Sequence, residues 1–270
     1  MPGLVTAVRG EDKTGKTSLA LSVVDYLQPP ADKVLHMELD IGGFERSAWR
    51  YREYINSGRI VNKRYHIPLK SIRDELMKPY KEAKILSGYK ELWYGKLLPD
   101  YVDALEDPTV GAIIVDSWKM WWDFCTSCLL QEKQEIARKD NKFREKLQQI
   151  EYGEANGRMR TAAYASKEAG KHLILVHPMT DERQQKMSRD GVLESVPTGR
   201  RLEEGWKHIG SVCDILVETQ HKEIIEGSRK VPKFLMKVIL SGSAKSTEGM
   251  EFQDPSFSTL MQLTEMARTV

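Results

Sequence analysis

A strand, a glycine-containing turn and a helix in immediate succession constrain the fold of this 270-residue chain more than any other feature. Residues 4–10 (LVTAVRG) are apolar and β-branched, and residues 10–17 (GEDKTGKT) contain a Gly-x-x-x-x-Gly-Lys-Thr motif. Residues 16–27 have helical spacing until two prolines end the pattern. In this context the motif predicts a loop whose backbone N–H groups surround a phosphate at a helix N-terminus, where the helix dipole favours anions.

The residues of this loop predict the cofactors. Gly10 and Gly15 permit the tight backbone, and Lys16 reaches the β- and γ-phosphates of a nucleoside triphosphate. The hydroxyl group of Thr17 ligates Mg²⁺. We therefore expect ATP and Mg²⁺ as cofactors and Lys16 as a catalytic residue. The predicted nucleotide-binding residues are Gly10, Glu11, Asp12, Lys13, Thr14, Gly15, Lys16, Thr17 and Ser18.

Further apolar runs, mostly separated by helical patterns, indicate the fold class. These runs are residues 33–40, 111–117, 172–178, 213–220 and 233–242. Runs of Val, Ile and Leu that alternate with helices are typical of strands buried on both faces of a parallel sheet. We expect an α/β fold with a mostly parallel central sheet flanked by helices and a C-terminal antiparallel hairpin. We also expect residues 1–270 to form a single domain.

Composition and cysteine content constrain the binding surfaces and the cellular compartment that we expect for this protein. The chain is 40% hydrophobic and 30% charged with a net charge of +2, so a polyanion-binding surface must be local. No run of about 20 apolar residues predicts a membrane span, and the N-terminus has no basic leader. Cys125 and Cys128 lie in an apolar stretch with helical spacing. We interpret them as buried thiols, and we expect a cytoplasmic protein without a membrane partner.

Polar residues at strand ends are the candidates for catalysis. Asp116 would bring a carboxylate to the Mg²⁺ beside Thr17, unless it only caps the next helix. We expect Glu38 and Asp40 to point to opposite faces of their strand, and Asp40, at the strand end, is preferred to orient or deprotonate the attacking water. We expect His177, the last residue of its strand, to sense the γ-phosphate; the alternative is a structural hydrogen-bonding histidine.

Aromatic residues follow the aspartate directly. Trp118, Trp121 and Trp122 share one helix face by their spacing. We predict that they belong to the core, with a base-stacking platform or a subunit contact as the alternative. Ser117 either polarises the site or caps the helix.

Residues 178–206 are polar and charged without an apolar period, and we predict a long loop there. Three interpretations stay open: a solvated surface segment, a contact with the backbone of a nucleic acid, or a source of arginines for a neighbouring active site. The basic residues concerned are Arg183, Lys186, Arg189, Arg200 and Arg201.

Residues 45–110 have the weakest secondary-structure signals of the chain. They contain several short helical patterns and a candidate strand at residues 65–69. We interpret the basic residues of this stretch as solubilising surface groups. They are Arg46, Arg50, Arg52, Arg59, Lys63 and Arg64.

The order of these motifs resembles the RecA-like P-loop ATPase core. GEDKTGKTSLAL is similar to the phosphate loop of that family, and MELDIGG to the strand whose last acidic residue activates water. AIIVDSW is similar to the strand of the Mg²⁺ aspartate, and LILVHP to the sensor strand, with His177 in place of a glutamine. Residues 197–220 resemble the DNA-binding loop with its following helix and strand, and residues 228–242 the closing hairpin. The size makes the chain most similar to phage-encoded RecA-like nucleotide-binding proteins and single-strand annealing ATPases.

The resemblance implies a homo-oligomer with ATP at the subunit interfaces that binds single-stranded DNA and assists annealing or recombination. It implies a host-cytoplasmic location if the protein is phage-encoded, and a single-strand binding protein as a further partner. Nucleotide binding would order the DNA-contacting loops, and a basic residue of the next subunit would complete the site, with Lys245, Arg200 and Arg201 as candidates. The alternatives are a P-loop phosphotransferase with residues 180–201 as its lid and a nucleotide-controlled assembly factor.

Overall fold

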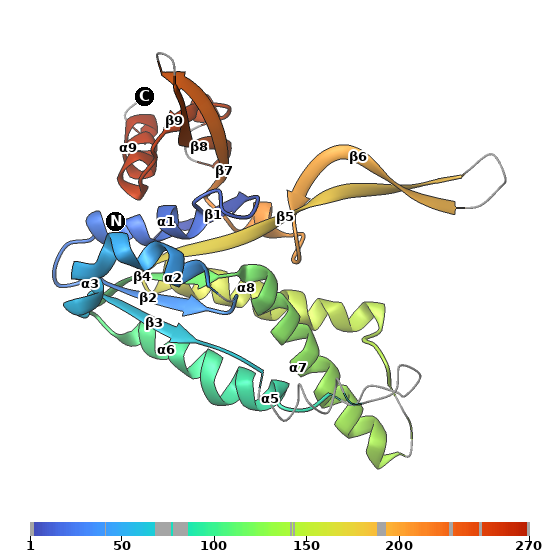
Figure 1. Ribbon diagram of the computed structural model, residues 1–270. Coiled ribbons are helices and arrows are strands. Elements are labelled where there is room, and N and C mark those ends of the chain that lie inside the picture. Colours follow the sequence, from blue (N-terminus) through green and yellow to red (C-terminus); the bar gives the residue numbers. More distant parts are fainter. Residues whose placement is uncertain are drawn as a thin grey trace.

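The computed structural model describes residues 3–40, 42–67, 77, 86–140, 142, 144–187, 193–226, 229–242 and 245–268. One mixed β-sheet forms the centre of this part of the chain (Figure 1). Its strands are β1 (Val5–Gly10), β2 (Lys33–Glu38), β3 (Ile60–Arg64), β4 (Val110–Asp116), β5 (His172–Met187), β6 (Leu193–Glu203), β7 (Ile215–Glu226), β8 (Arg229–Ser241) and β9 (Glu251–Gln253).

The sheet is mostly parallel. Its order is β3-β2-β4-β5-β1-β7-β8-β9, and β6 pairs with the outer part of β5. The strands from β3 to β7 in this order are parallel, whereas β8 and β9 extend the β7 edge in antiparallel orientation. The predicted α/β class, with a mostly parallel sheet and a C-terminal antiparallel hairpin, is therefore confirmed.

Helices cover both faces of the sheet because parallel neighbours need long crossover connections (Figure 1). Residues of α1, α2 and α9 pack into the core on one face, and residues of α6, α7 and α8 pack into the core on the other. The helices are α1 (Lys16–Leu21), α2 (Gly43–Ala48), α3 (Arg52–Asn56), α5 (Tyr89–Leu92), α6 (Leu98–Glu106), α7 (Trp118–Lys139), α8 (Tyr152–Glu168) and α9 (Phe257–Arg268), with a π-helical turn at Trp93–Leu97.

The central strands are buried on both faces, which explains their continuous apolar runs. In β4, Ile113 and Val115 enter the core beneath α7, whereas Ala112 and Ile114 enter the core beneath α1. Side chains of a strand alternate between its two faces, so each face must be apolar when helices cover both.

The predicted helix 16–27 is shorter than expected. It is α-helical only over Lys16–Leu21 and continues as a 3₁₀ helix over Ser22–Asp25. Ser22 explains the change, since its hydroxyl donates to the Leu19 carbonyl at 2.6 Å and accepts from the Phe257 backbone N–H at 2.7 Å. A serine that bonds its own backbone competes with α-helical pairing, and here it also anchors α9.

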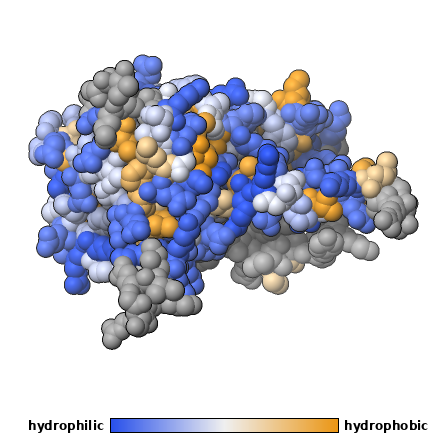
Figure 2. Space-filling model, turned by 90° about the horizontal axis from the view of Figure 1, so that it is seen from above, coloured by the Kyte–Doolittle hydropathy of each residue, from blue (hydrophilic) through white to orange (hydrophobic). Residues whose placement is uncertain are grey.

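The prediction of a loop over residues 178–206 is wrong. Strand β5 continues to Met187 and pairs with β6 in an antiparallel hairpin that projects from the body (Figure 1). This arm is mostly hydrophilic with a few apolar residues (Figure 2), of which Met187 and Leu193 are 70% and 62% exposed. Backbone hydrogen bonds hold a two-stranded ribbon that water surrounds, so its sequence carries no apolar alternation.

The predicted position of the candidate strand, residues 65–69, is wrong. The strand of this region is β3, residues Ile60–Arg64, whereas residues 65–67 are irregular and residues 68 and 69 lie outside the described residues. Polar side chains occupy three positions of β3 because it is the edge strand of the sheet. These polar residues interrupt the apolar pattern, so the sequence did not predict this strand.

The aromatic prediction is confirmed for two of three tryptophans. Trp118 and Trp121 are fully buried and stacked at 5.4 Å, and Trp93 contacts Trp121 edge-on at 5.5 Å. Trp122 is only partly buried and packs against the same core. Cys125 and Cys128 are buried free thiols, as predicted. Within the described ranges, no helix combines the length and apolarity needed to cross a bilayer.

We predict that Trp121→Ala destabilises the protein by about 3–5 kcal/mol, because it leaves a cavity among the rings of Trp93, Tyr101 and Trp118. The matched control is Trp49→Ala, since Trp49 is 71% exposed and its change should stay within about 0.5 kcal/mol. Denaturant midpoints at constant slope measure both. Equal shifts for the two variants would contradict a core role for Trp121.

Candidate functional site

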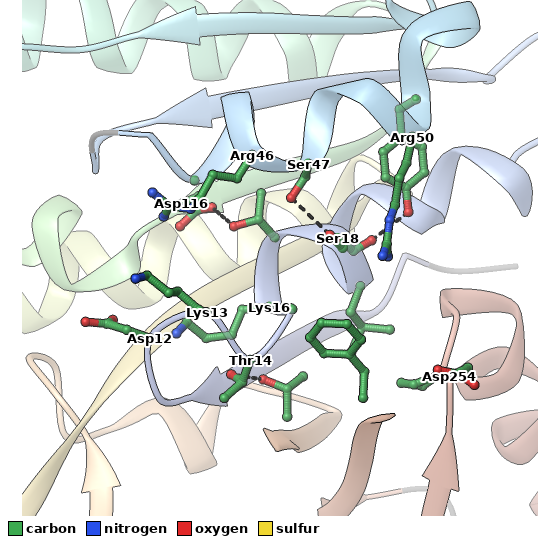
Figure 3. A pocket seen from close by; sticks show the side chains of 18 of the residues that line it. Asp12, Lys13, Thr14, Lys16, Ser18, Arg46, Ser47, Arg50, Asp116 and Asp254 are labelled. Atoms are coloured by element: carbon green, nitrogen blue, oxygen red, sulfur yellow. Dashed lines mark hydrogen bonds between the residues drawn. The ribbon is translucent and has the colours of Figure 1, made fainter. Parts of the chain in front are cut away.

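A cavity of about 360 Å³ opens at the carboxyl ends of the parallel strands (Figure 3). Its walls come from the predicted phosphate loop with the start of α1, from the segment after β2, and from the C-terminal strands. The lining residues fall within 12–19, 40–51 and 234–255, with Asp116 and Thr219 between them. Ligands of open α/β sheets bind at this edge, where connections leave the strands.

The phosphate loop has the backbone that its glycines predict. Gly15 has φ of +89°, and a Cβ on Gly10 would lie 2.3 Å from the Thr219 hydroxyl, so neither position accommodates a side chain without strain. The ammonium group of Lys16 donates to the carbonyl oxygens of Gly10 at 2.9 Å and Glu11 at 2.6 Å. Residues 12–18 line the cavity, whereas Gly10 and Glu11 contribute through these carbonyls.

Burial lowers the pKa of Lys16, although the carboxylates of Asp12, Asp116 and Asp40 oppose the shift. Its ammonium group is therefore partly desolvated inside the loop. An anion bound there would supply charge-assisted hydrogen bonds that loop carbonyls cannot match.

Thr17 and Asp116 meet beside Lys16. The Thr17 hydroxyl donates to Asp116 Oδ2 at 2.7 Å. Gly43, at the start of α2, leaves space beside this pair, since a Cβ there would lie 3.1 Å from Thr17 Oγ1 and 3.2 Å from Asp116 Oδ2. A hydroxyl and a carboxylate are hard oxygen donors of the kind that Mg²⁺ takes together with substrate phosphates. The residues therefore fit the predicted magnesium site.

Asp116 stays ionised in spite of its surroundings. Burial raises its pKa, but the His36 imidazole, the Thr17 hydroxyl and the charge of Lys16 outweigh this and bring the pKa below its usual value. Nε2 of His36 lies 3.7 Å from Asp116 Oδ2. Sequence reasoning missed His36, because one buried histidine within an apolar strand carries no distinguishing pattern.

Ser117, whose role the sequence leaves open, caps the following helix. Its hydroxyl accepts a hydrogen bond from the Met120 backbone N–H at 3.4 Å at the start of α7. Ser117 therefore caps α7, and the Asp116 carboxylate accepts a hydrogen bond from Thr17.

Glu38 and Asp40 lie in different surroundings, but the prediction that alternation turns them to opposite faces is wrong. Residues two positions apart share one face of a strand, and Asp40 differs because β2 ends at Glu38 and the chain leaves the sheet before Asp40. Asp40 is exposed and lines the cavity. Glu38 is 2% exposed and accepts from Asn62 at 3.0 Å and Arg64 at 2.6 Å. Burial raises the pKa of Glu38, and the hydrogen bonds from Asn62 and Arg64 overcome this and lower it. The water-orienting role of Asp40 stays a prediction.

His177 does not line the cavity. It is fully buried and continues the alternation of Leu173 and Leu175, which belong to the core on the face away from α1. Burial lowers its pKa to about 4, with Glu203 opposing the shift, so the imidazole is neutral near pH 7. The sensor role predicted for His177 remains a prediction without a contact to the cavity.

The far end of the cavity is aromatic. The Arg50 guanidinium lies 5.9 Å from the centre of the Phe234 ring and 5.1 Å from that of Trp49. Phe234 also packs against the loop, since a Cβ on Gly15 would lie 3.1 Å from its ring. A flat ring beside a planar cation is a surface on which a nucleotide base stacks.

Two arginines interpreted as solubilising surface groups line the cavity, namely Arg46 and Arg50. They lie on the turns that follow Asp40, where α2 brings them across the phosphate loop. Their spacing of four residues indicates that they share one helix face. That this face lies opposite the phosphate loop depends on the crossover connection after β2, which the sequence does not predict.

The basic residues of the arm are spread along it. Arg201, at its base, forms an ion pair with Glu11 of the phosphate loop and lies 3.5 Å from Asp181. Arg183 donates to Ser195 across the hairpin at 3.2 Å, and Lys186 and Arg200 are exposed. Arg189 lies outside the described residues. None of the described residues within 180–201 lines the cavity.

Lys245 lies just beyond Ser241, which pairs with Ile215 at the amino end of the parallel strands. The phosphate loop leaves β1 at the opposite edge, where Gly10 pairs with Thr219. Lys245 therefore approaches the cavity only if it belongs to a second subunit.

Fold and cavity define an α/β protein with a candidate anion and cation site at the carboxyl edge of a mostly parallel sheet. No family model matches the sequence, and the comparison with curated proteins gives no significant match. The argument for function therefore rests on the site itself.

We predict that Phe234→Leu weakens binding of ATP about tenfold, because stacking of a base on an aromatic ring contributes about 1–3 kcal/mol. Binding of inorganic tripolyphosphate should not change. Calorimetric titration with both ligands measures this, and Phe252→Leu, in neighbouring β9 and outside the cavity lining, is the control. Equal losses for the two ligands would mean that the ring supports the loop and not a base.

Proposed function

We propose that the protein is a Mg²⁺-dependent ATPase of the RecA-like class that binds single-stranded DNA and assists strand annealing or recombination. The hydrogen bond between Thr17 and Asp116 carries this proposal. It joins the motif after β1 to the aspartate at the end of β4, as a phosphate-loop ATPase requires for its metal ion. The order of the motifs along the chain supports the RecA-like class.

Each residue around the loop has a role in this proposal. Lys16 exchanges its bonds to loop carbonyls for bonds to phosphate oxygens, and Asp40 orients the attacking water. Arg46 adds a positive charge at the same end of the cavity, where negative charge develops on the transferred phosphoryl group. Thr17 and Asp116 would hold Mg²⁺, which neutralises phosphate charge when bound.

Two hairpins support the DNA-binding part. A groove of about 1100 Å³ lies between the β5–β6 and β7–β8 hairpins and borders the phosphate loop. Arg200 and Lys222 contribute cations from opposite walls, and the rings of His221 and Phe234 are 5.5 Å apart within the groove lining. Cations for phosphates and rings for bases are what sequence-independent binding of a single strand needs.

The base of the arm contacts the nucleotide site directly. Arg201 of β6 pairs with Glu11 of the phosphate loop. Nearby, Arg9 of β1 bridges Glu203 of β6 at 2.7 Å and Glu218 of β7 at 2.8 Å, so both hairpins are tied to the strand that bears the loop. A ligand that reorders the loop therefore acts on the arm through charge contacts, and DNA on the arm acts on the loop.

The alternatives have less support. A phosphotransferase lid would cover the cavity, and none of the described residues within 180–201 lines it. An assembly factor would need neither acceptor nor DNA. The proposed homo-oligomer would have to bring Lys245 of a neighbouring subunit to the site, since within one chain it lies at the opposite edge of the sheet.

Phosphate release from ATP, with and without single-stranded DNA at low and moderate salt, tests the proposal. DNA should raise the rate, and the stimulation should fade with salt because phosphate contacts release counterions. Lys16→Ala should abolish turnover in every condition. A rate that Lys16→Ala leaves unchanged would exclude this site as the source of hydrolysis, and a rate indifferent to DNA would remove the recombination function.

We further predict that the ion pair between Arg201 and Glu11 transmits the DNA effect. Arg201→Gln and Glu11→Gln should each reduce the stimulation by DNA about fivefold, the lower end of usual coupling energies, because both groups are partly exposed. The double variant should lose no more than either single variant. Arg183→Gln, farther along the arm, should weaken DNA affinity without changing stimulation at saturation. Additive losses would mean that the pair transmits nothing.

A further inference from the structure

We propose that Phe234 couples the nucleotide cavity to the DNA groove, because the base of a bound nucleotide immobilises a ring that also lines the groove. This inference rests on the proposed function, since it assumes a nucleotide in the cavity and single-stranded DNA in the groove. It adds that the base of the nucleotide, and not only its phosphates, raises the affinity for DNA.

The ring of Phe234 belongs to both binding spaces. It lines the cavity of about 360 Å³ and also the groove of about 1100 Å³. Among the described residues, Arg50 lines the cavity but not the groove, and its guanidinium lies 5.9 Å from the ring centre. His221 lines the groove but not the cavity, and its ring centre lies 5.5 Å from that of Phe234. A ligand in either space can therefore reach this ring.

The backbone of Phe234 is held on both sides. It pairs with His221 of β7, and its carbonyl accepts from the Asp254 backbone N–H at 2.9 Å, next to β9. Met236 and Val238 follow on the same face of β8 and are buried in the core beneath α1. Phe234 is the residue at which this row leaves the core, and it is only half-buried. Its side-chain torsions are therefore the freedom that ligands can remove.

A base in the cavity would remove this freedom. The ring lies against the phosphate loop, since a Cβ on Gly15 would be 3.1 Å from Phe234 Cδ1. A base that packs between the ring and the Arg50 guanidinium orders the Phe234 side chain, at a cost in conformational entropy. A second ligand that needs the same ring ordered then loses less entropy on binding. Tripolyphosphate has no base, so it would occupy the loop without ordering the ring.

A base of the DNA strand would use the same ring from the groove. The rings of Phe234 and His221 are tilted by 56° to each other and form an aromatic pair on one face of the β7–β8 hairpin. Bases of any identity stack on such rings, while cations hold the phosphates of the strand. We therefore expect positive coupling of about fivefold between the two bases, which is the scale for ordering one side chain.

Binding of a fluorescent oligothymidylate in Mg²⁺ tests the inference without turnover. Its dissociation constant is measured by anisotropy without a ligand, with saturating tripolyphosphate, and with a saturating nonhydrolysable ATP analogue. For the unaltered protein, the analogue should raise the affinity for the oligonucleotide about fivefold more than tripolyphosphate does. Because coupling is reciprocal, the oligonucleotide should raise the affinity for the analogue about fivefold more than the affinity for tripolyphosphate.

Three variants separate coupling from support of the fold. Phe234→Leu should abolish both fivefold differences and bind tripolyphosphate as before, whereas Phe234→Tyr keeps a flat ring and should retain them. His221→Leu should weaken oligonucleotide binding and leave binding of the analogue in the absence of DNA unchanged. Phe252→Leu, in β9, is the matched control, because Phe252 is also half-buried but lies outside both linings, and it should keep both differences.

The outcomes keep the two proposals apart. If the unaltered protein fails to bind the analogue or the oligonucleotide, the proposed function fails. If it binds both but tripolyphosphate acts as strongly as the analogue, or if Phe234→Leu keeps the differences, only the coupling through Phe234 is overturned. Loss of tripolyphosphate binding in Phe234→Leu would show that the ring supports the loop, which also overturns the inference. Unchanged oligonucleotide binding in His221→Leu would mean that no strand base contacts the aromatic pair, with the same consequence.

Discussion

The contact between Thr17 and Asp116 is the constraint on which the rest of the site depends. These residues are 99 positions apart in the chain, and their strands, β1 and β4, are not neighbours because β5 lies between them. A 2.7 Å hydrogen bond across this gap requires the loop after β1 and the end of β4 to turn toward the same face. The first turn of α2 completes the arrangement, since only a glycine at position 43 leaves the space beside the pair open. A hard cation with its phosphate ligands fits such a space.

The two cores explain why the polar residues gather where they do. Apolar side chains fill both faces of the central strands, so a buried polar group is tolerated only where a partner can be reached. Such partners exist at the carboxyl edge, where Asp116, His36 and Glu38 share the face beneath α1 and α2. On the other face, Arg9 meets acidic residues from both hairpins. The two faces of the sheet therefore separate the candidate anion and cation site from the charge contacts that tie the hairpins to β1, although both lie at one edge.

The hairpins are extensions of the same strands that build the core. β5 runs from the buried sheet into the arm without interruption, and β7 and β8 extend in the same way. A displacement of either hairpin is therefore transmitted to a strand that borders β1, since β5 and β7 lie on its two sides. This continuity, together with the pair between Arg201 and Glu11, gives a physical basis for coupling between a polymer on the arm and a ligand in the loop.

The sequence by itself determined the α/β class, the glycine-containing loop between β1 and α1 and the aspartate at the end of β4, because each depends on local spacing or on burial of a strand on both faces. It did not separate Asp40 from Glu38, because residues two positions apart share a face of a strand and the end of β2 at Glu38 is what sets them apart. Only the tertiary structure decided that residues 178–206 form a paired arm, that Arg46, Arg50 and Phe234 line the cavity, and that His36 faces Asp116. These features depend on strand order and register, which join residues far apart in the chain. A solvated ribbon, an edge strand and a single buried histidine leave no periodic signal in the sequence.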